Sequence, residues 1–126
     1  MSDILADGAA WLDGMRRAHL SRHVSYKRDG VTSPCLATIS SSVFETQTEM
    51  GVVERWESRD FIVSAGDMPM DYPERGDYIT DTIGGVAVTY QVSAPRGAPV
   101  WKWADASRTA MRIHTTAIVD PSLPQE

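Results

Sequence analysis

A change of hydrophobic period near residue 20 constrains the fold of this chain more than any other feature of its sequence. Residues 3–20 place apolar side chains at three- and four-residue steps, the spacing of an amphipathic helix. From His23 onward apolar and polar residues alternate, which is the period of a half-buried strand. Parallel strands need helical crossovers, and no helical spacing separates the later strands. The sequence therefore predicts one N-terminal helix followed by antiparallel strands.

Turn signals divide the remaining chain into short strands. Asp29-Gly30 and Gly84-Gly85 are tight hairpin turns, and the polar residues 40–42 predict a break. Pro34 has no amide proton, so its strand should lie at an edge or be broken there. The strands that we expect are 23–28, 31–39, 52–58, 59–63, 78–82, 86–92 and 109–119, with Pro/Gly-rich loops at 66–73 and 93–100.

The predicted fold is mainly β: a small antiparallel β-barrel or sandwich with one N-terminal α-helix and a long loop. A length of 126 residues suits one hydrophobic core. We expect residues 1–21 to form a helix that packs on the barrel or on a neighbour. Residues 22–119 should form the barrel domain, and 120–126 a disordered tail.

Composition narrows the classes of protein. No apolar run approaches the roughly 20 residues of a membrane span, and residues 1–17 lack the apolar stretch of a secretory signal. Cys35 is the single cysteine, which excludes a disulfide within the chain. The net charge is −5, and residues 1–28, with five Lys/Arg against three Asp, carry +2. This short basic segment is not the broad basic face of a specific DNA-binding protein. We expect a protein of the cytoplasm, or of a particle assembled there.

The residues typical of catalysis and metal binding do not form a known pattern. His19, His23 and His114 lack metal-ligand spacing, and Cys35 reads as a small core residue. We predict no catalytic residue, no cofactor and no metal site. An enzyme would instead show a cleft that gathers His114 with two or more carboxylates. The carboxylates that we expect on a solvated face are Glu54, Glu57, Asp60, Asp67 and Asp71.

The tripeptide Arg75-Gly76-Asp77 matches the signal that integrins read on adhesion proteins. Such ligands are secreted and commonly carry disulfides, whereas this chain has one cysteine. Glycine tolerates positive φ, and aspartate can hydrogen-bond within its own turn. We therefore interpret the motif as the turn that leads from a loop into a strand.

Two apolar groups are candidates for contact with another protein. Trp101 and Trp103 share one side of an extended segment, where they either fill the barrel end or bind a partner. The loop 66–73 either is a plain surface connection or docks to another subunit. The interface residues that we predict are Trp101, Trp103, Met68, Met70 and Tyr72.

Four phrases together carry a resemblance to a known family: VSYKR (24–28), ESRDFIVSAGDM (57–68), PERGDYI (73–79) and WKWADASRTAMRIHT (101–115). Their order after an N-terminal helix resembles the head-tail joining or head-completion proteins of bacteriophages, also called stoppers or connectors. The resemblance implies a small β-barrel with a long loop that forms a ring below the portal. Such a ring closes the DNA channel after packaging and offers a surface to the tail.

The same resemblance implies partners and a location. The partners would be other copies of the chain, portal or adaptor proteins and tail-terminator proteins, with DNA passing non-specifically through the lumen and no membrane. The location would be the neck of the virion, assembled in the host cytoplasm. The channel-facing residues that we predict are Asp67 and Asp71, since an acidic lumen repels phosphate.

Two alternatives remain at this point. The chain could be a tail terminator or adaptor subunit of the same neck. It could also be a small β-barrel module that binds a peptide or carbohydrate, in which case Trp101 and Trp103 should form an exposed platform on a lone monomer.

Overall fold

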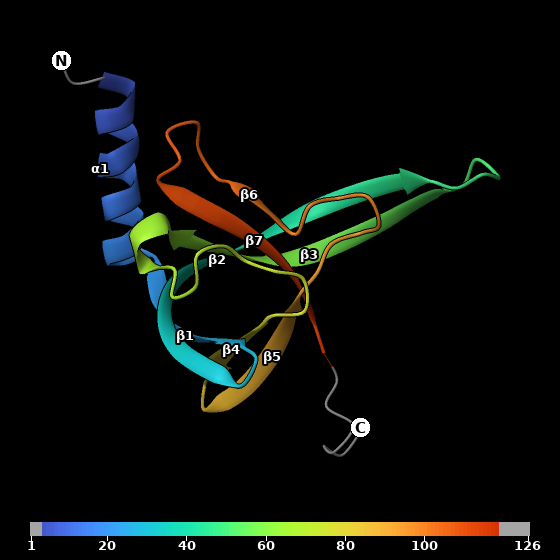
Figure 1. Ribbon diagram of the computed structural model, residues 1–126. Helices are drawn as coiled ribbons and strands as arrows, with labels where there is room; N and C mark the ends of the chain where they lie inside the picture. The colour runs from blue at the N-terminus through green and yellow to red at the C-terminus, as the bar shows by residue number, and fades with distance from the viewer. Residues whose placement is uncertain (1–3, 119–126) are drawn as a thin grey trace.

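The computed structural model describes the backbone of residues 4–118 and the side chains in that range, except those at 4–6, 17 and 46. Within this range, a helix precedes seven strands, and a 3-10 turn follows the third strand (Figure 1). The elements are α1 (Ile4–His19), β1 (Ser21–Arg28), β2 (Val31–Gln47), β3 (Val53–Ser64), η1 (Ala65–Asp67), β4 (Tyr78–Ile83), β5 (Val86–Val92), β6 (Trp101–Trp103) and β7 (Ala110–Ala117). No described helix is long and apolar enough to cross a membrane. The expected disordered tail, 120–126, lies outside the described residues.

The strands close into a barrel. Hydrogen bonds join them in the order β3-β2-β1-β4-β5-β7, and β7 pairs again with β3, where Phe61 lies opposite Ile113. One edge of β7 pairs with two strands: its residues 111–113 pair with β6, and its residues 115–117 pair with β5. All pairings are antiparallel. The prediction of a mainly β fold with an N-terminal helix is confirmed, and its form is the six-stranded barrel.

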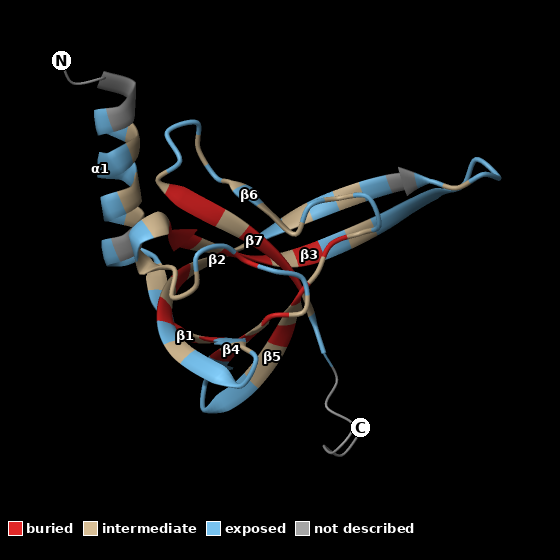
Figure 2. Cartoon of the chain, viewed as in Figure 1, coloured by how far each residue is buried: buried red, intermediate tan, exposed pale blue. Residues whose placement is uncertain are grey.

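Alternating side chains of these strands fill the barrel. Tyr26, Phe61, Ile79 and Ile113 are fully buried, and Figure 2 shows buried residues concentrated on the barrel strands. Each such side chain contributes about 1.5–3 kcal/mol relative to an exposed position. Cys35 is buried among them, and this burial, together with nearby Asp67, raises the pKa of its thiol to about 12. The thiol is therefore a core group and not a nucleophile.

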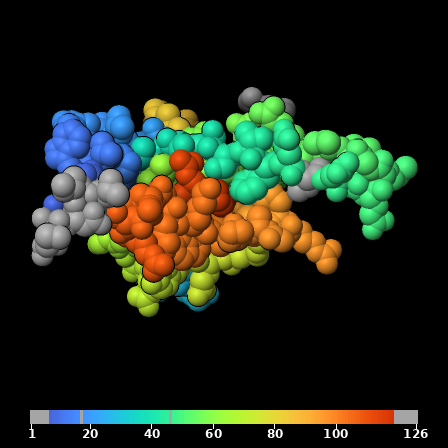
Figure 3. Space-filling model, turned by 90° about the horizontal axis from the view of Figure 1, so that it is seen from above, coloured from blue at the N-terminus to red at the C-terminus, as the bar shows by residue number. Residues whose placement is uncertain are grey.

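Strands β2 and β3 extend beyond the barrel as a two-stranded ribbon. They pair from Thr38 opposite Ile62 to Gln47 opposite Val53, whereas the pairing of β3 with β7 ends at Arg59. The outer part of the ribbon, 43–57, projects from the end of the molecule opposite α1 (Figures 1 and 3). We call residues 43–57 the β2–β3 arm.

Two sequence predictions in this region are wrong. Residues 40–42 are not a break, and β3 is one strand where we expected two. The serines pair with β3, and the Ser42 hydroxyl donates a hydrogen bond to the Asp60 carboxylate. A polar stretch can continue a strand when a neighbouring strand satisfies its backbone and side chains.

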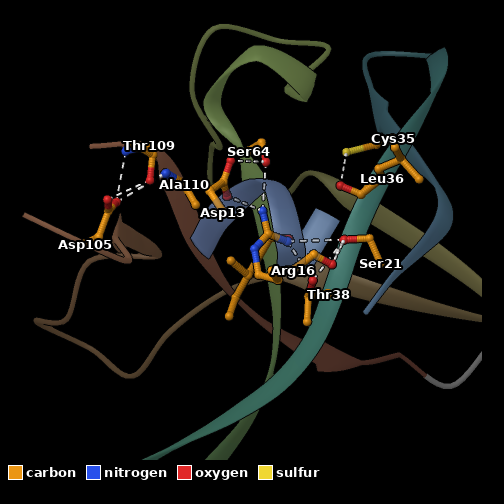
Figure 4. A network of polar contacts seen from close by, with 11 residues as sticks. Asp13, Arg16, Ser21, Cys35, Leu36, Thr38, Ser64, Asp105, Thr109 and Ala110 are labelled. Carbon is orange, nitrogen blue, oxygen red and sulfur yellow. Dashed lines mark hydrogen bonds and ion pairs between the residues drawn. The ribbon is translucent and has the colours of Figure 1, made fainter. Parts of the chain in front are cut away.

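Helix α1 is attached to the barrel through polar contacts centred on Arg16 (Figure 4). Its guanidinium donates to the Thr38 hydroxyl (2.6 Å), the Ile62 carbonyl (3.0 Å) and the Ser64 hydroxyl (2.8 Å). Asp13, one turn earlier, accepts from Arg16 at 2.6 Å and from Ser64 at 2.8 Å. The attachment therefore uses hydrogen bonds to β2 and β3.

The apolar stripe of α1 stays largely exposed. Trp11, Leu12 and Met15 all have exposed side chains, with Leu12 at 62%, and so does Leu20 directly after the helix. Figure 2 shows α1 mostly in the colour of exposed residues. An apolar stripe of this size on a helix is typical of a surface that another element covers.

Candidate functional site

A buried polar cluster joins the barrel to the root of the arm. The Asp60 carboxylate, with no solvent exposure, accepts from Arg112 Nη1 (2.8 Å) and Ser58 Oγ (2.6 Å) and pairs with His114 Nδ1 at 2.9 Å. Ser42 donates to the same carboxylate. These residues come from β2, β3 and β7, so the cluster fixes three strands where the arm leaves the barrel.

This cluster differs from the cleft that we named as the sign of an enzyme. His114 is 3% exposed and pairs with the carboxylate of Asp60. The expected sign of an enzyme was a cleft in which His114 lies beside at least two carboxylates. Among the described residues, no group of three or more His, Cys, Asp or Glu side chains could hold a metal ion. The expectation that Asp60 lies on a solvated face is wrong, because Arg112 and His114 of β7 come to lie beside it.

The tripeptide at 75–77 forms part of a second buried cluster. Asp77 is 4% exposed and accepts from the Tyr26 hydroxyl, from Arg28 Nη2 (2.7 Å) and from the Glu74 amide (3.0 Å). Gly76 has φ of +95°, a conformation that favours glycine. Arg75 donates to the Ala94 carbonyl at 3.1 Å. The buried carboxylate cannot reach a receptor, so the motif is a turn held by an ion pair.

A third buried aspartate, Asp81, has a carboxylate that accepts from Arg22. Its other oxygen, Oδ1, has no partner among the described residues. Each of the three buried aspartates thus pairs with an arginine on a neighbouring strand. The sequence gives no local sign of these pairs, because their members lie far apart along the chain.

The environments of Asp60 and Asp77 lower their pKa values. Burial disfavours the charged form of each carboxylate. At Asp60 the hydrogen bonds from His114 and from Ser42, Ser58 and Arg112 outweigh burial, so the pKa lies below its ordinary value. At Asp77 the bonds from Arg28 and Tyr26 have the same effect on the pKa.

These two carboxylates are expected to make the protein acid-sensitive. Both bind protons more weakly in the folded chain than in the unfolded chain, so their stabilisation is complete above the unfolded pKa of about 4 and is lost as the pH falls below it. Urea unfolding between pH 2 and 7 should show this loss. Asp77→Asn should flatten the profile, while Asp71→Asn, at an exposed position, should keep the wild-type slope. Equal slopes for the wild type and Asp77→Asn would contradict the assignment.

The structure brings the predicted interface residues together. Tyr72 stacks on Trp101 with ring centroids 5.3 Å apart, and Trp101 meets Trp103 edge-on at 5.1 Å. Met68, Met70 and both tryptophans pack partly against the barrel core. Tyr72 is the exposed member, and Arg28 holds its carbonyl at 2.6 Å. The loop therefore reaches its own core, and a role in binding a partner stays a prediction.

The two predicted channel residues lie in different environments. Asp67 is half-buried at the end of η1 and close enough to Cys35 to influence its thiol. Asp71 is exposed in the following loop. Their orientation toward a channel stays a prediction.

A groove of about 790 Å³ lies between α1 and the outer face of the barrel. Leu12 and Met15 of α1, with Leu20 directly after the helix, form one wall, and Ile62 and Ala110 also line the groove. The loop 104–109 forms the other wall. Within this loop, the Asp105 carboxylate accepts hydrogen bonds from the amide and the hydroxyl of Thr109 (Figure 4). We call this the α1 groove. Sequence reasoning missed it because it arises where three distant segments meet.

The arm is the other feature that the sequence did not reveal. Met50 at its tip is 90% exposed, and Val43, Val52 and Val53 are also exposed. At its root, Phe44 packs on Trp56 and on His114, with ring centroids 5.4 and 5.0 Å apart. The only sequence pattern that could have indicated the arm is the run of apolar and acidic residues at 43–54. We expected this run to lie within the barrel domain.

The family model described as phage head-tail joining protein matches residues 2–122, nearly the whole chain. No curated protein gives a significant match. The resemblance seen in the sequence is thereby confirmed. The chain belongs to the phage head-tail joining protein family and is a structural protein of the virion neck.

Proposed function

We propose that this neck protein forms a ring below the portal, helps to close the DNA channel after packaging and offers a docking surface to the tail. The observation that carries the proposal is a pair of apolar surfaces that are exposed in the described part of the subunit, one on α1 and one on the β2–β3 arm. A family whose members join head to tail contacts portal and tail proteins in the neck. Exposed apolar surfaces of this kind mark contacts between proteins.

The predicted residues receive roles within this ring. We assign Trp101, Trp103 and Tyr72, with Met68 and Met70 supporting them, to the contact with a portal, adaptor or tail-terminator protein. Aromatic side chains at an irregular surface are common anchors of protein interfaces. Asp67 and Asp71 would face the lumen, where carboxylates keep DNA from adhering as it passes. Assembly would take place in the host cytoplasm.

The geometry favours the neck role over a binding module. A platform for a peptide or carbohydrate needs exposed, coplanar indoles. Trp101 and Trp103 instead meet at 83° and are half-buried, and Tyr72 stacks on one of them. A tail terminator or an adaptor would use the same surfaces. An experiment is therefore needed to distinguish these two roles from that of a ring below the portal.

Removal of the gene from the phage tests the proposed function. Heads without the protein should package DNA, lose it during purification and carry no tails, and a plasmid copy should restore all three properties. Heads that keep their DNA would contradict channel closure. Tails of abnormal length with sealed heads would assign the chain to tail termination instead.

A further inference from the structure

The side of α1 that faces the barrel is small and polar. Among the described side chains of α1, those of Ala9, Asp13 and Arg16 are half-buried, and the others are exposed. These three residues recur at steps of four and three positions, so they lie on one side of the helix. The described large apolar side chains of α1 lie outside this stripe and remain exposed. Most helices in proteins are stabilised by the packing of an apolar face, and α1 has little of this packing.

The attachment of α1 to the barrel is concentrated in Arg16. Its guanidinium donates hydrogen bonds to partners on three strands: the hydroxyls of Ser21 (3.3 Å), Thr38 and Ser64 and the carbonyl of Ile62 (Figure 4). Asp13 adds a bond from the Ser64 hydroxyl at the same point. The described side chains at 7–12, by contrast, make no hydrogen bond or ion pair with the barrel. Within the described side chains of α1, polar contact with the barrel therefore comes from the last two turns.

The sequence of α1 does not compensate for this weak packing. Gly8 and Gly14 both lower its helix propensity. A helix of 16 residues with such a composition is marginal in water without tertiary support. A methyl group added at either glycine would meet no atom of another element within 4 Å. Close packing therefore does not require these glycines, and their presence makes α1 easier to unwind.

We infer that α1 is a separately opening element: it unwinds and leaves the barrel while the strands stay folded, and the contacts of Arg16 set the free energy of this opening. Segments with few buried groups open in this way at a lower free energy than the core. Among the described residues, the core cluster of the barrel contains none from α1. The strands also close on themselves without α1, since β7 pairs with β3. The barrel can therefore stay folded when α1 opens.

This inference concerns the single subunit and holds whether or not the proposed ring forms. An element that opens alone can change its position during assembly without unfolding of the barrel. The purified full chain is therefore enough to test the inference, and the result is independent of the test of the proposed function.

Hydrogen exchange in the purified full chain tests the separate opening. The amides of 8–19 should exchange at least about tenfold faster than those of β5 and β7, since they need only the local opening. Low concentrations of urea should accelerate exchange of the barrel amides and leave that of α1 nearly unchanged, because the local opening exposes much less surface than global unfolding. Equal rates and equal urea dependence in α1 and in the barrel would overturn the inference.

A core substitution on β4 separates the local opening from global unfolding. Ile79 is fully buried, and Ile79→Val should speed exchange of the barrel amides about fivefold through the loss of one buried methylene. The amides of α1 should keep their wild-type rates, since the substitution does not change the local opening. The same acceleration in α1 as in the barrel would show that the helix opens only when the barrel unfolds, which rejects the inference.

Two substitutions in α1 test the role of Arg16 and of the helix itself. Arg16→Lys should speed exchange of α1 at least about tenfold, because an ammonium group keeps the charge but not the branched set of hydrogen bonds. Gly14→Ala should slow it about fivefold, since alanine favours the helix and its methyl group meets no other element. Arg22→Lys makes the same chemical change on β1, where the arginine pairs with Asp81, and should leave α1 at its wild-type rate. Wild-type exchange in Arg16→Lys, or equal acceleration by Arg22→Lys, would show that Arg16 does not control the opening.

Chymotrypsin gives a second measurement if the amides of α1 exchange too fast to rank the variants. The peptide bond after Trp11 is cleaved only when that turn of α1 unwinds, and the cleavage rate follows the population of the open form. Cleavage should be faster in Arg16→Lys than in the wild type, slower in Gly14→Ala, and unchanged in Ile79→Val. Cleavage that instead follows the unfolding of the barrel in every variant would overturn the inference.

Discussion

Asp60→Asn is expected to lower the free energy of unfolding by about 3–5 kcal/mol, the usual cost of removing one partner from a buried ion pair. The substitution leaves the Arg112 guanidinium without its counter-charge, and an amide oxygen cannot accept all the hydrogen bonds that the carboxylate receives. The melting temperature should fall by roughly 10–20 °C. Thermal and urea unfolding followed by circular dichroism would measure both quantities.

The matched control for Asp60 is Asp71. Both changes remove one negative charge, but Asp71 is exposed, so Asp71→Asn should alter the unfolding free energy by less than about 0.5 kcal/mol. Hydrogen exchange should further show that Asp60→Asn speeds exchange in the β2–β3 arm, since the cluster fixes its root. A loss of unfolding free energy below about 1 kcal/mol for Asp60→Asn would show that the cluster does not hold the root of the β2–β3 arm.

Asp77→Asn is expected to cost about 3 kcal/mol of unfolding free energy for the same physical reason. Asp77 balances Arg28 and accepts the Tyr26 hydroxyl inside the barrel, and burial together with this hydrogen bond raises the pKa of Tyr26. Arg28 also holds the Tyr72 carbonyl. The variant should therefore loosen the loop at 66–73, which limited proteolysis would detect as faster cleavage there.

Arg75→Lys is the control within the same tripeptide. Arg75 donates a hydrogen bond to the Ala94 carbonyl from an exposed position, and lysine keeps the charge and a donor. Stability should change by less than about 0.5 kcal/mol, and complementation of the phage should persist. A loss of assembly with normal stability would instead show that Arg75 contacts a partner in the neck.

Asp60 and Asp77, whose replacement is expected to cost the most stability, are both buried. The composition of the chain gives no reason to place them there, and aspartate is rarely fully buried unless it is paired. We expected Asp60 on a solvated face, but it is buried. We interpreted Asp77 as a turn residue, and its carboxylate does accept a hydrogen bond from the Glu74 amide within the turn. What the sequence could not supply was the position of each arginine across the sheet.

The sequence by itself determined the local features of this protein. The helix at 4–19 follows from its spacing, and the hairpins at Asp29-Gly30 and Gly84-Gly85 follow from residues that adopt positive φ. The quoted phrases identified the family. These features depend on neighbours within a few residues, so a linear pattern encodes them.

Only the tertiary structure decided how distant segments meet. The continuity of β2 through its serines depends on β3, and the charge of Asp60 depends on β7. The groove beside α1 exists because Arg16 holds the helix by polar bonds and leaves its apolar stripe uncovered. Such contacts join residues tens of positions apart, and their free energy depends on geometry that no local pattern records.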